Sequence, residues 1–180
     1  MSYSNCTMRL LATILIIFVT ITKSFSSDSI TVYLFLLDEC RICQELAPEI
    51  NAIHAEFTKK NIGFIGLFPN FASKQGAIDK FKKKYKISLQ TRTDYYKKIA
   101  KKFNAEILPT AVVFNETNQK IEYIGAINDL FYKPGKRKSQ AREHYLRDAL
   151  SSVIKGISPE ITSTQPIGCF INFNDNLLNH

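Results

Sequence analysis

The 180-residue chain has 24 Lys and Arg residues against 16 Asp and Glu residues, which gives a formal net charge of +8, and 45% of its residues are hydrophobic. A chain of this length can bury a substantial core, so we expect one domain with additional segments. Most of the excess positive charge falls in the runs 80–86, 97–102 and 136–138. No aromatic and basic recognition motif accompanies these runs, so we expect no nucleic-acid partner. Solvated basic faces are the simpler interpretation, and a surface for acidic partners or anionic lipid is the alternative.

Residues 1–26 have the pattern of a targeting segment. Arg9 supplies positive charge, residues 10–21 form an apolar run, and Ser24-Phe25-Ser26 places small residues at a cleavage position. The run is shorter than the roughly 20 residues that span a bilayer, which favours a cleaved signal peptide. An uncleaved anchor, with membrane association through residues 10–21, and a buried helix are the alternatives. We therefore expect an exported protein, in the periplasm or on the outer face of the cytoplasmic membrane of a bacterium.

Apolar runs and helical periodicity alternate along residues 27–157, which we expect to form the domain, with an irregular C-terminal tail over 158–180. Pro48 is expected to kink the first helix, because it removes one helical hydrogen bond. Ser73 is expected to cap the amino end of the second helix. In chain order, we predict a strand over 30–37, a helix up to residue 60, a strand over 61–68, a helix from 73 to 85, an extended piece over 87–89, a helix over 94–103, a strand over 107–114, a turn over 115–119, a strand over 120–124 and a helix over 140–155.

The stretch Cys40-Arg41-Ile42-Cys43 stands where the first strand ends and the first helix begins. Unpaired backbone N–H groups and the helix dipole at that end favour a thiolate on the first sulfur. One helical turn later, the second cysteine can reach the first and close a disulfide. Arg41 should lower the pKa of Cys40, and Glu39 should oppose it. The spacing therefore predicts a redox-active pair, with a structural disulfide or two inert buried thiols as the alternative.

The remaining cysteines and the histidines give no sign of a metal site. Cysteines occur at positions 6, 40, 43 and 169, and removal of a signal peptide would leave the last three in a compartment that permits disulfides. A zinc site would normally need a second close cysteine pair, and the histidines at 54, 144 and 180 are scattered. We expect neither a metal nor another cofactor.

The chain resembles thioredoxin-fold redoxins, particularly the exported TlpA-like and AhpC/TSA-like branch. The features that carry this resemblance are residues 40–43 after the first strand, Leu108-Pro109-Thr110 at the start of a later strand, and Gly125 after the hairpin. Residues 145–150 and Gly168-Cys169 are similar to a bacterial redoxin subgroup with such a tail. The resemblance implies an α/β thioredoxin-like three-layer fold, with a central mixed sheet and an insertion after the second strand.

The resemblance also implies a thiol–disulfide oxidoreductase that acts on protein disulfides. Cys40 would be the exposed nucleophile and the more buried Cys43 would resolve the mixed disulfide. Pro109 would follow a cis peptide bond, and the backbone of Leu108 would bind the substrate chain. Partners would be protein dithiol or disulfide clients and an upstream redox donor or acceptor. The chain departs from thioredoxins in having Leu34 in place of a buried carboxylate.

Three alternatives stay open at this point. A peroxiredoxin-like peroxidase would need Pro and Thr seven and three positions before the attacking cysteine, where this chain has Tyr33 and Leu37. A non-catalytic protein of the same fold is the second alternative, either a partner-binding module or a metal chaperone. A copper chaperone of this fold would need a wider cysteine spacing and a distal histidine. Cys169 is either a tail thiol outside the active site or a third redox thiol that folds back and exchanges with Cys40 and Cys43.

Overall fold

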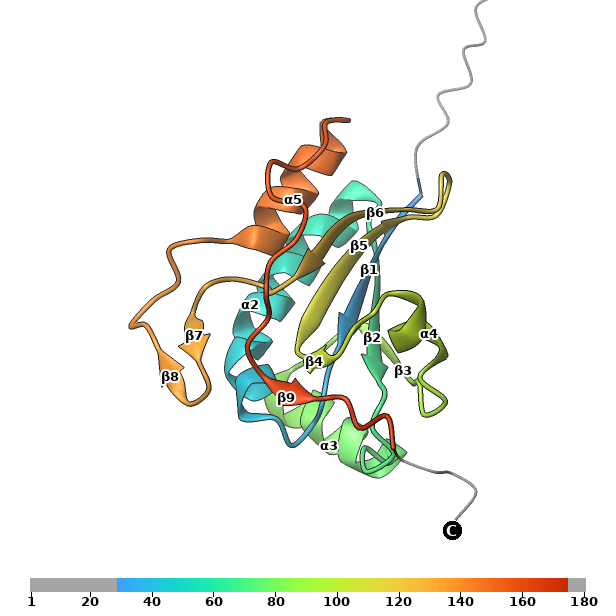
Figure 1. Cartoon of the computed structure of the whole chain (residues 1–180), viewed down its shortest axis with the longest axis vertical. Coiled ribbons are helices and arrows are strands. Elements are labelled where there is room, and N and C mark those ends of the chain that lie inside the picture. Colours follow the sequence, from blue (N-terminus) through green and yellow to red (C-terminus); the bar gives the residue numbers. More distant parts are fainter. Residues whose placement is uncertain (1–28, 175–180) are drawn as a thin grey trace, which may run out of the picture.

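The computed structural model describes residues 29–174, so the predicted targeting segment 1–26 and the last part of the tail lie outside the described residues. At the centre of the described part is a mixed sheet of five strands in the order β3-β2-β1-β5-β6 (Figure 1). Strands β1, β2 and β3 run parallel, whereas β5 and β6 are antiparallel to their neighbours. The strands of this sheet are β1 (Ile30–Phe35), β2 (Gly63–Phe68), β3 (Gln90–Thr93), β5 (Thr110–Asn115) and β6 (Lys120–Gly125).

Helices cover both faces of this sheet, which confirms the predicted three-layer α/β fold. On one face, Arg147 of α5 forms ion pairs with Glu49 and Glu56 of α2, and the Asn51 amide of α2 donates to the Tyr85 carbonyl of α3. The short helix α4 lies on the opposite face (Figure 1). The helices are α2 (Arg41–Phe57), continued by a 3₁₀ turn (Thr58–Lys60), α3 (Gln75–Tyr85), α4 (Lys98–Lys102) and α5 (Tyr145–Ile154).

The two central strands are covered on both sides, which explains why they are almost continuously apolar in the sequence. Every residue of β5 is buried, and β1 alternates between fully buried and partly buried positions. On the α4 face, the ring of Phe103 lies 5.1 Å from the rings of both Tyr33 and Phe114. This aromatic cluster holds the short helix α4 against the sheet.

The predicted strand over 107–114 is interrupted at Pro109. The Leu108–Pro109 peptide bond is cis, as the resemblance implied. The chain therefore forms a short strand β4 (Ile107–Leu108) before the bond and the long β5 after it, and β4 leaves the main sheet. Proline has no backbone N–H to offer a sheet ladder, which agrees with a break at this position.

The segment after α5 runs back across the edge of the sheet and ends beside β4 (Figure 1). It forms an isolated parallel bridge between Ser163 and Ile124, and then β9 (Cys169–Phe170), which pairs antiparallel with β4. The sequence predicted an irregular tail here, and β9 is the short exception. A separate hairpin of β7 (Phe131–Lys133) and β8 (Lys136–Arg137) was not predicted.

Three helices start later than the sequence predicted. Ser73 does not cap α3: its hydroxyl donates to the Asp38 carboxylate, and the helix starts at Gln75 with Lys74 at its amino end. The predicted helix over 94–103 is shorter and runs only over Lys98–Lys102, and the Asp94 carboxylate accepts hydrogen bonds from the amides of Ile99 and Ala100 in its first turn. The predicted helix over 140–155 begins only at Tyr145.

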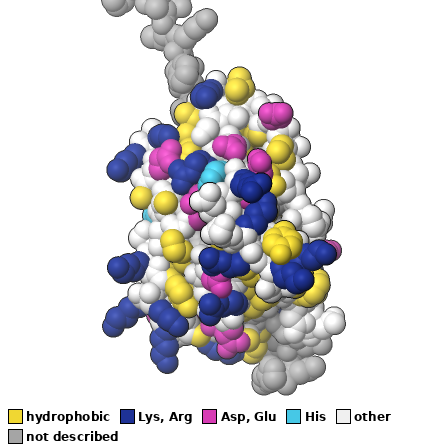
Figure 2. All heavy atoms as spheres, turned by 90° about the vertical axis from the view of Figure 1, so that its left-hand side faces the viewer, with side chains coloured by type: hydrophobic (Ala, Val, Ile, Leu, Met, Phe, Trp, Pro, Cys, Tyr) yellow, Lys and Arg dark blue, Asp and Glu magenta, His cyan; other side chains and the backbone are white. Residues whose placement is uncertain are grey.

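The basic runs are only partly solvated faces. Lys97 was placed on an exposed helical face by the sequence pattern, and this is wrong, because the residue is 3% exposed and precedes α4 in a left-handed conformation. In the run 136–138, Arg137 pairs with Glu45 and Lys138 with Asp129. Figure 2 shows basic and acidic side chains interleaved on the face that carries β7, β8 and α5. Within residues 29–174, no helix is both long and apolar enough to cross a membrane.

Candidate active site

Cys40 lies where the chain leaves β1 and enters α2. It directly precedes the first helical residue, Arg41, with an extended backbone conformation. Its carbonyl accepts a hydrogen bond from the Gln44 amide at 3.0 Å, which starts the helix. The predicted order of strand, cysteine pair and helix is therefore present. The sequence predicted an exposed Cys40, and this is wrong for the described conformation, in which the residue is 1% exposed.

The pKa of Cys40 is lowered to about 5. The largest cause is a hydrogen bond from the side chain of Cys43, and burial opposes it. Further hydrogen bonds come from the Cys169 side chain and from the backbone amides of Cys43 and Ile42. These amides belong to the first turn of α2, where backbone N–H groups have no partner within the helix. Cys40 is therefore a thiolate at neutral pH, the form in which cysteine acts as a nucleophile.

The two neighbouring cysteines have the opposite shift. Cys43 is fully buried, and burial and the adjacent Cys40 raise its pKa well above the usual value. Burial and Cys40 also raise the pKa of Cys169 to about 12. Of the three cysteines, Cys40 therefore carries the negative charge. The other two remain thiols that can donate hydrogen bonds to its sulfur.

The charged neighbours that the sequence suggested are not the main cause of the lowered pKa of Cys40. Arg41 points away into an ion pair with Glu45 at 2.7 Å, and its side chain is 80% exposed. Glu45 also binds Arg137 at 2.6 Å. The largest contributions to the lowered pKa of Cys40 are hydrogen bonds from thiols and helix amides instead. Direct hydrogen bonds outweigh a charge that is screened by solvent.

The cis-proline segment stands directly against the first sulfur. The Sγ atom of Cys40 lies 3.5 Å from the carbonyl oxygen of Leu108, although the two residues are 68 positions apart. Leu108 is completely buried, and the Thr110 hydroxyl donates to the Ile107 carbonyl at 2.6 Å, which closes the turn around Pro109. The structure thus brings together Cys40, Cys43, Leu108 and Pro109.

The structure also brings in Cys169, whose Sγ atom lies 2.6 Å from that of Cys40. Its residue pairs with Leu108 in the ladder between β4 and β9. This position contradicts the alternative in which Cys169 is a tail thiol outside the active site. All the candidate site residues predicted from the sequence are therefore neighbours, and Cys6 lies outside the described residues.

Sequence analysis did not single out Asn70, which helps to hold the tail at this site. Its side-chain amide donates to the carbonyl of Phe170 at 3.2 Å, and its side-chain oxygen accepts from the backbone amide of Asn172 at 2.8 Å. Asn70 is 9% exposed and stands two residues after the end of β2. An Asn after Pro69 reads in the sequence only as a turn signal, so its partners 100 positions away could not be found there.

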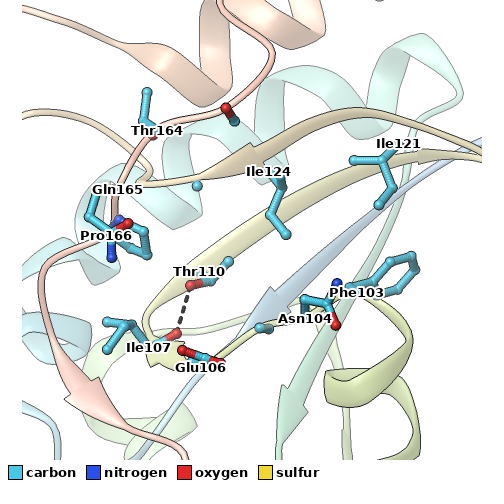
Figure 3. A pocket seen from close by; sticks show the side chains of 13 residues that line it. Phe103, Asn104, Glu106, Ile107, Thr110, Ile121, Ile124, Thr164, Gln165 and Pro166 are labelled. Atoms are coloured by element: carbon cyan, nitrogen blue, oxygen red, sulfur yellow. Dashed lines mark hydrogen bonds between the residues drawn. The ribbon is translucent and has the colours of Figure 1, made fainter.

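A pocket of about 540 Å³ lies beside the tail on the α4 side of the sheet. Figure 3 shows Ile121 and Ile124 of β6 on one side, Phe103 and Asn104 on another, and the tail residues Thr164, Gln165 and Pro166 over the edge. None of the described cysteines lines it. Nor do residues 29–174 contain a cluster of three or more His, Cys, Asp or Glu side chains arranged to hold a metal ion.

A cysteine pair at the amino end of the helix that follows a central strand, facing a cis-proline turn from the next antiparallel strand, defines a thioredoxin-like protein. Solved structures agree with this fold. The chain is similar to an uncharacterized conserved protein from Geobacillus kaustophilus, with 19% identity, a TM-score of 0.70, and coverage of 83% of this chain and 80% of that one. It is similar to a hypothetical protein from Sinorhizobium meliloti 1021, with 18% identity, a TM-score of 0.72, and coverage of 83% and 82%.

A third solved structure, of a thioredoxin-like protein in the oxidized form, has 13% identity, a TM-score of 0.54, and coverage of 73% of this chain and 81% of that one. The chain belongs to the AhpC/TSA family, whose model matches residues 19–124. No curated protein matches the sequence. The family match ends before β9 and so does not include Cys169. Only the geometry of this chain bears on the role of that residue.

Proposed function

We propose that this protein is a thiol–disulfide oxidoreductase that acts on protein disulfides outside the cytoplasm. The observation that carries the proposal is the position of the Cys40 sulfur, which precedes the first turn of α2 and lies 3.5 Å from the Leu108 carbonyl oxygen at the cis-proline turn. A hydrogen bond from Cys43, one helical turn later, is the largest cause that lowers the pKa of Cys40 to about 5. A thiolate of this kind reacts with disulfides at neutral pH, when ordinary cysteine is mostly protonated.

The cycle needs only the two cysteines. The Cys40 thiolate attacks one sulfur of the substrate disulfide, the substrate bond breaks, and the other substrate sulfur leaves as a thiolate. Cys43 then loses its proton, which the departing substrate thiolate can accept, and attacks the Cys40 sulfur. The mixed disulfide breaks and the second substrate sulfur leaves as a thiolate, which takes a proton from water. The substrate is then a dithiol, and the protein holds a Cys40–Cys43 disulfide. Two electrons have passed to the substrate, and the reverse sequence oxidises a dithiol.

The geometry also supports a binding site for the substrate chain. The backbone of Leu108 forms a two-residue ladder with an antiparallel strand, at the position next to the Cys40 sulfur. A substrate polypeptide in extended conformation could add to the same edge, where backbone hydrogen bonds would accept many sequences. We therefore assign substrate binding to Leu108 and Pro109, with protein dithiols or disulfides as clients.

The location and the redox partner follow from the sequence pattern. A cleaved signal peptide over 1–26 would deliver the protein to the periplasm or to the outer face of the cytoplasmic membrane. If the segment were retained, residues 10–21 would associate the domain with the membrane. An upstream dithiol or disulfide partner would then restore the Cys40–Cys43 pair after each turnover.

Reduction of insulin by dithiothreitol, followed as turbidity, tests the activity. We expect the wild-type protein to accelerate the reaction and Cys40→Ser to return it to the uncatalysed rate. Hydrogen peroxide consumption in the same preparation serves as the comparison for the peroxidase alternative. The Cys40–Cys43 reduction potential decides the direction: a value near about −270 mV indicates a reductase, and one near about −120 mV an oxidant. A wild-type protein that accelerates only peroxide consumption would overturn the proposal.

A further inference from the structure

We propose that β9 is an internal stand-in for the substrate chain, and that Cys169 exchanges disulfides with Cys40 in the place of a substrate cysteine. This inference rests on the proposed function, because it assigns to the tail the site at which a client would react. It makes Cys169 a third redox residue, and it makes the tail a strap that covers the active site.

The pairing of β9 with β4 is the first observation behind the proposal. The strand runs antiparallel to β4, with Cys169 opposite Leu108 and Phe170 opposite Ile107. This ladder occupies the backbone edge that an extended client would need. A client chain and the tail therefore cannot use Leu108 at the same time.

The tail is fastened on the far side of Cys169. The backbone amide of Ile171 donates to the Glu106 carbonyl at 2.8 Å, and the Ile171 side chain is 5% exposed. Asn70 holds the carbonyl of Phe170 and the backbone amide of Asn172. Because the Asn70 side chain binds two backbone groups of the tail, it fixes the register of the tail against the domain.

The tail is fastened again before it reaches the site. The Ile124 amide donates to the Thr162 carbonyl at 3.0 Å, and the Thr164 amide donates to the Ile124 carbonyl at 3.1 Å. The Thr164 hydroxyl lies 2.6 Å from the Tyr123 hydroxyl and accepts from the Ala126 amide at 2.9 Å. In Figure 3, Thr164 to Pro166 pass over the end of β6 toward the active-site edge.

Two glycines allow the tail to come this close. A Cβ atom on Gly168 would lie 1.8 Å from the Leu108 carbonyl oxygen, and one on Gly125 would lie 2.3 Å from the Thr164 hydroxyl oxygen. No larger residue fits either position without movement of the tail or the sheet. The approach to Leu108 is therefore built into the sequence on both the tail and the domain.

The positions of the sulfur atoms are the last observation behind the proposal. The Cys169 Sγ lies 2.6 Å from the Cys40 Sγ, so no other group can stand between them. Cys40 is 1% exposed although it carries the reactive thiolate, and the Cys169 sulfur and the Leu108 carbonyl oxygen both contact its sulfur from outside α2. Access to Cys40 thus requires that the tail moves.

The exchange step needs no external oxidant once the protein holds a Cys40–Cys43 disulfide. Cys169 loses its proton and its thiolate attacks the Cys40 sulfur, so that a Cys40–Cys169 bond forms while the Cys40–Cys43 bond breaks. The electron pair of the broken bond stays on Cys43, which takes up the proton. The protein remains oxidised by two electrons throughout, and Cys43 reverses the step by attack on the Cys40 sulfur.

Disulfide mapping of the full chain tests the exchange. We expect Cys43→Ala, treated with diamide after full reduction, to yield an intramolecular Cys40–Cys169 disulfide, and the same variant with Cys169→Ser to lack it. Mild oxidation of the wild-type protein, quenched in acid, should give both the Cys40–Cys43 and the Cys40–Cys169 species. This second measurement does not depend on the folding of the Cys43 variant.

The strap is tested by the rate at which iodoacetamide alkylates Cys40 in the reduced protein at neutral pH. Gly168→Ala should displace β9 and accelerate alkylation several-fold. Gly76→Ala is the matched control, because a Cβ atom there has nothing within 4 Å, and it should leave the rate unchanged.

The outcomes separate this inference from the proposed function. If the wild-type protein reduces insulin but forms only Cys40–Cys43 on mild oxidation, and Cys43→Ala forms no Cys40–Cys169 disulfide, the exchange is overturned and the oxidoreductase stays in place. An unchanged alkylation rate in Gly168→Ala would overturn the strap. A wild-type protein that forms no Cys40 disulfide and reduces no insulin would overturn the proposed function itself.

Discussion

The carbonyl oxygen of Leu108 lies 3.5 Å from the Sγ atom of Cys40, although three α-helices and two strands separate them along the chain. This contact joins the two halves of the site: the thiol that α2 activates and the backbone edge that can hold an extended polypeptide. The predictions below test the chemistry on one side of the contact and the scaffold that supports it on the other.

The two cysteines of the pair should fail in different ways when replaced. Cys43→Ser keeps the Cys40 nucleophile but removes the group that resolves the mixed disulfide, so we expect it to accumulate a covalent complex with a disulfide substrate. Cys40→Ser should form no such complex. Non-reducing electrophoresis with insulin as substrate gives the measurement. Equal residual activity in the two variants would contradict these roles.

The reactivity of Cys40 should follow its own ionisation. With a pKa of about 5, the thiolate fraction is constant near neutral pH, and the alkylation rate falls about tenfold per pH unit below that pKa. Mass spectrometry of iodoacetamide-treated protein at a series of pH values gives the midpoint. A midpoint near that of ordinary cysteine would contradict the activation by α2.

The midpoint should also identify the activating group. The hydrogen bond from Cys43 contributes more to the lowered pKa than the one from Cys169 does. We therefore expect Cys43→Ala to move the midpoint upward further than Cys169→Ala. The reverse order would show that the tail, rather than the helix, controls the thiolate.

Phe103 should be a main support of the α4 face. It is 2% exposed and contacts the rings of Tyr33, Phe35 and Phe114. Its replacement by Ala should lower the free energy of unfolding by about 3–5 kcal/mol, because it leaves a cavity among these rings. Urea denaturation gives the value. Tyr96→Ala is the control, since Tyr96 is 71% exposed and should change the free energy by less than about 0.5 kcal/mol.

Asp94 should stabilise the start of α4. Its carboxylate accepts from the amides of Ile99 and Ala100 and is largely buried. Asp94→Ala leaves these donors without their acceptor, so we expect a loss of about 1–3 kcal/mol in urea denaturation. Asp94→Asn keeps an acceptor oxygen and should recover part of the loss. A full loss in the Asn variant would point to the charge rather than to the hydrogen bonds.

The sequence determined the elements that depend on local pattern. The apolar runs of β1, β2 and β5, the helical stripe of α2 and the placement of Cys40 and Cys43 between them follow from periodicity and spacing, and they identify the fold class. Pro109 and Gly125 were further local signals, because proline restricts the backbone at its position whereas glycine permits the positive φ angle that Gly125 has.

Tertiary structure decided what covers the reactive sulfur. The resemblance implied an exposed Cys40, and the sequence placed Arg41 and Glu39 as opposing influences on its pKa. The fold instead buries the residue, and hydrogen bonds from Cys43 and Cys169 join those from the helix amides that the sequence predicted. The sequence pattern likewise made Ser73 a helix cap, whereas in the fold its hydroxyl donates to the Asp38 carboxylate. Burial and hydrogen bonding depend on which segments meet in space, and no local pattern around residue 40 encodes the arrival of residue 169.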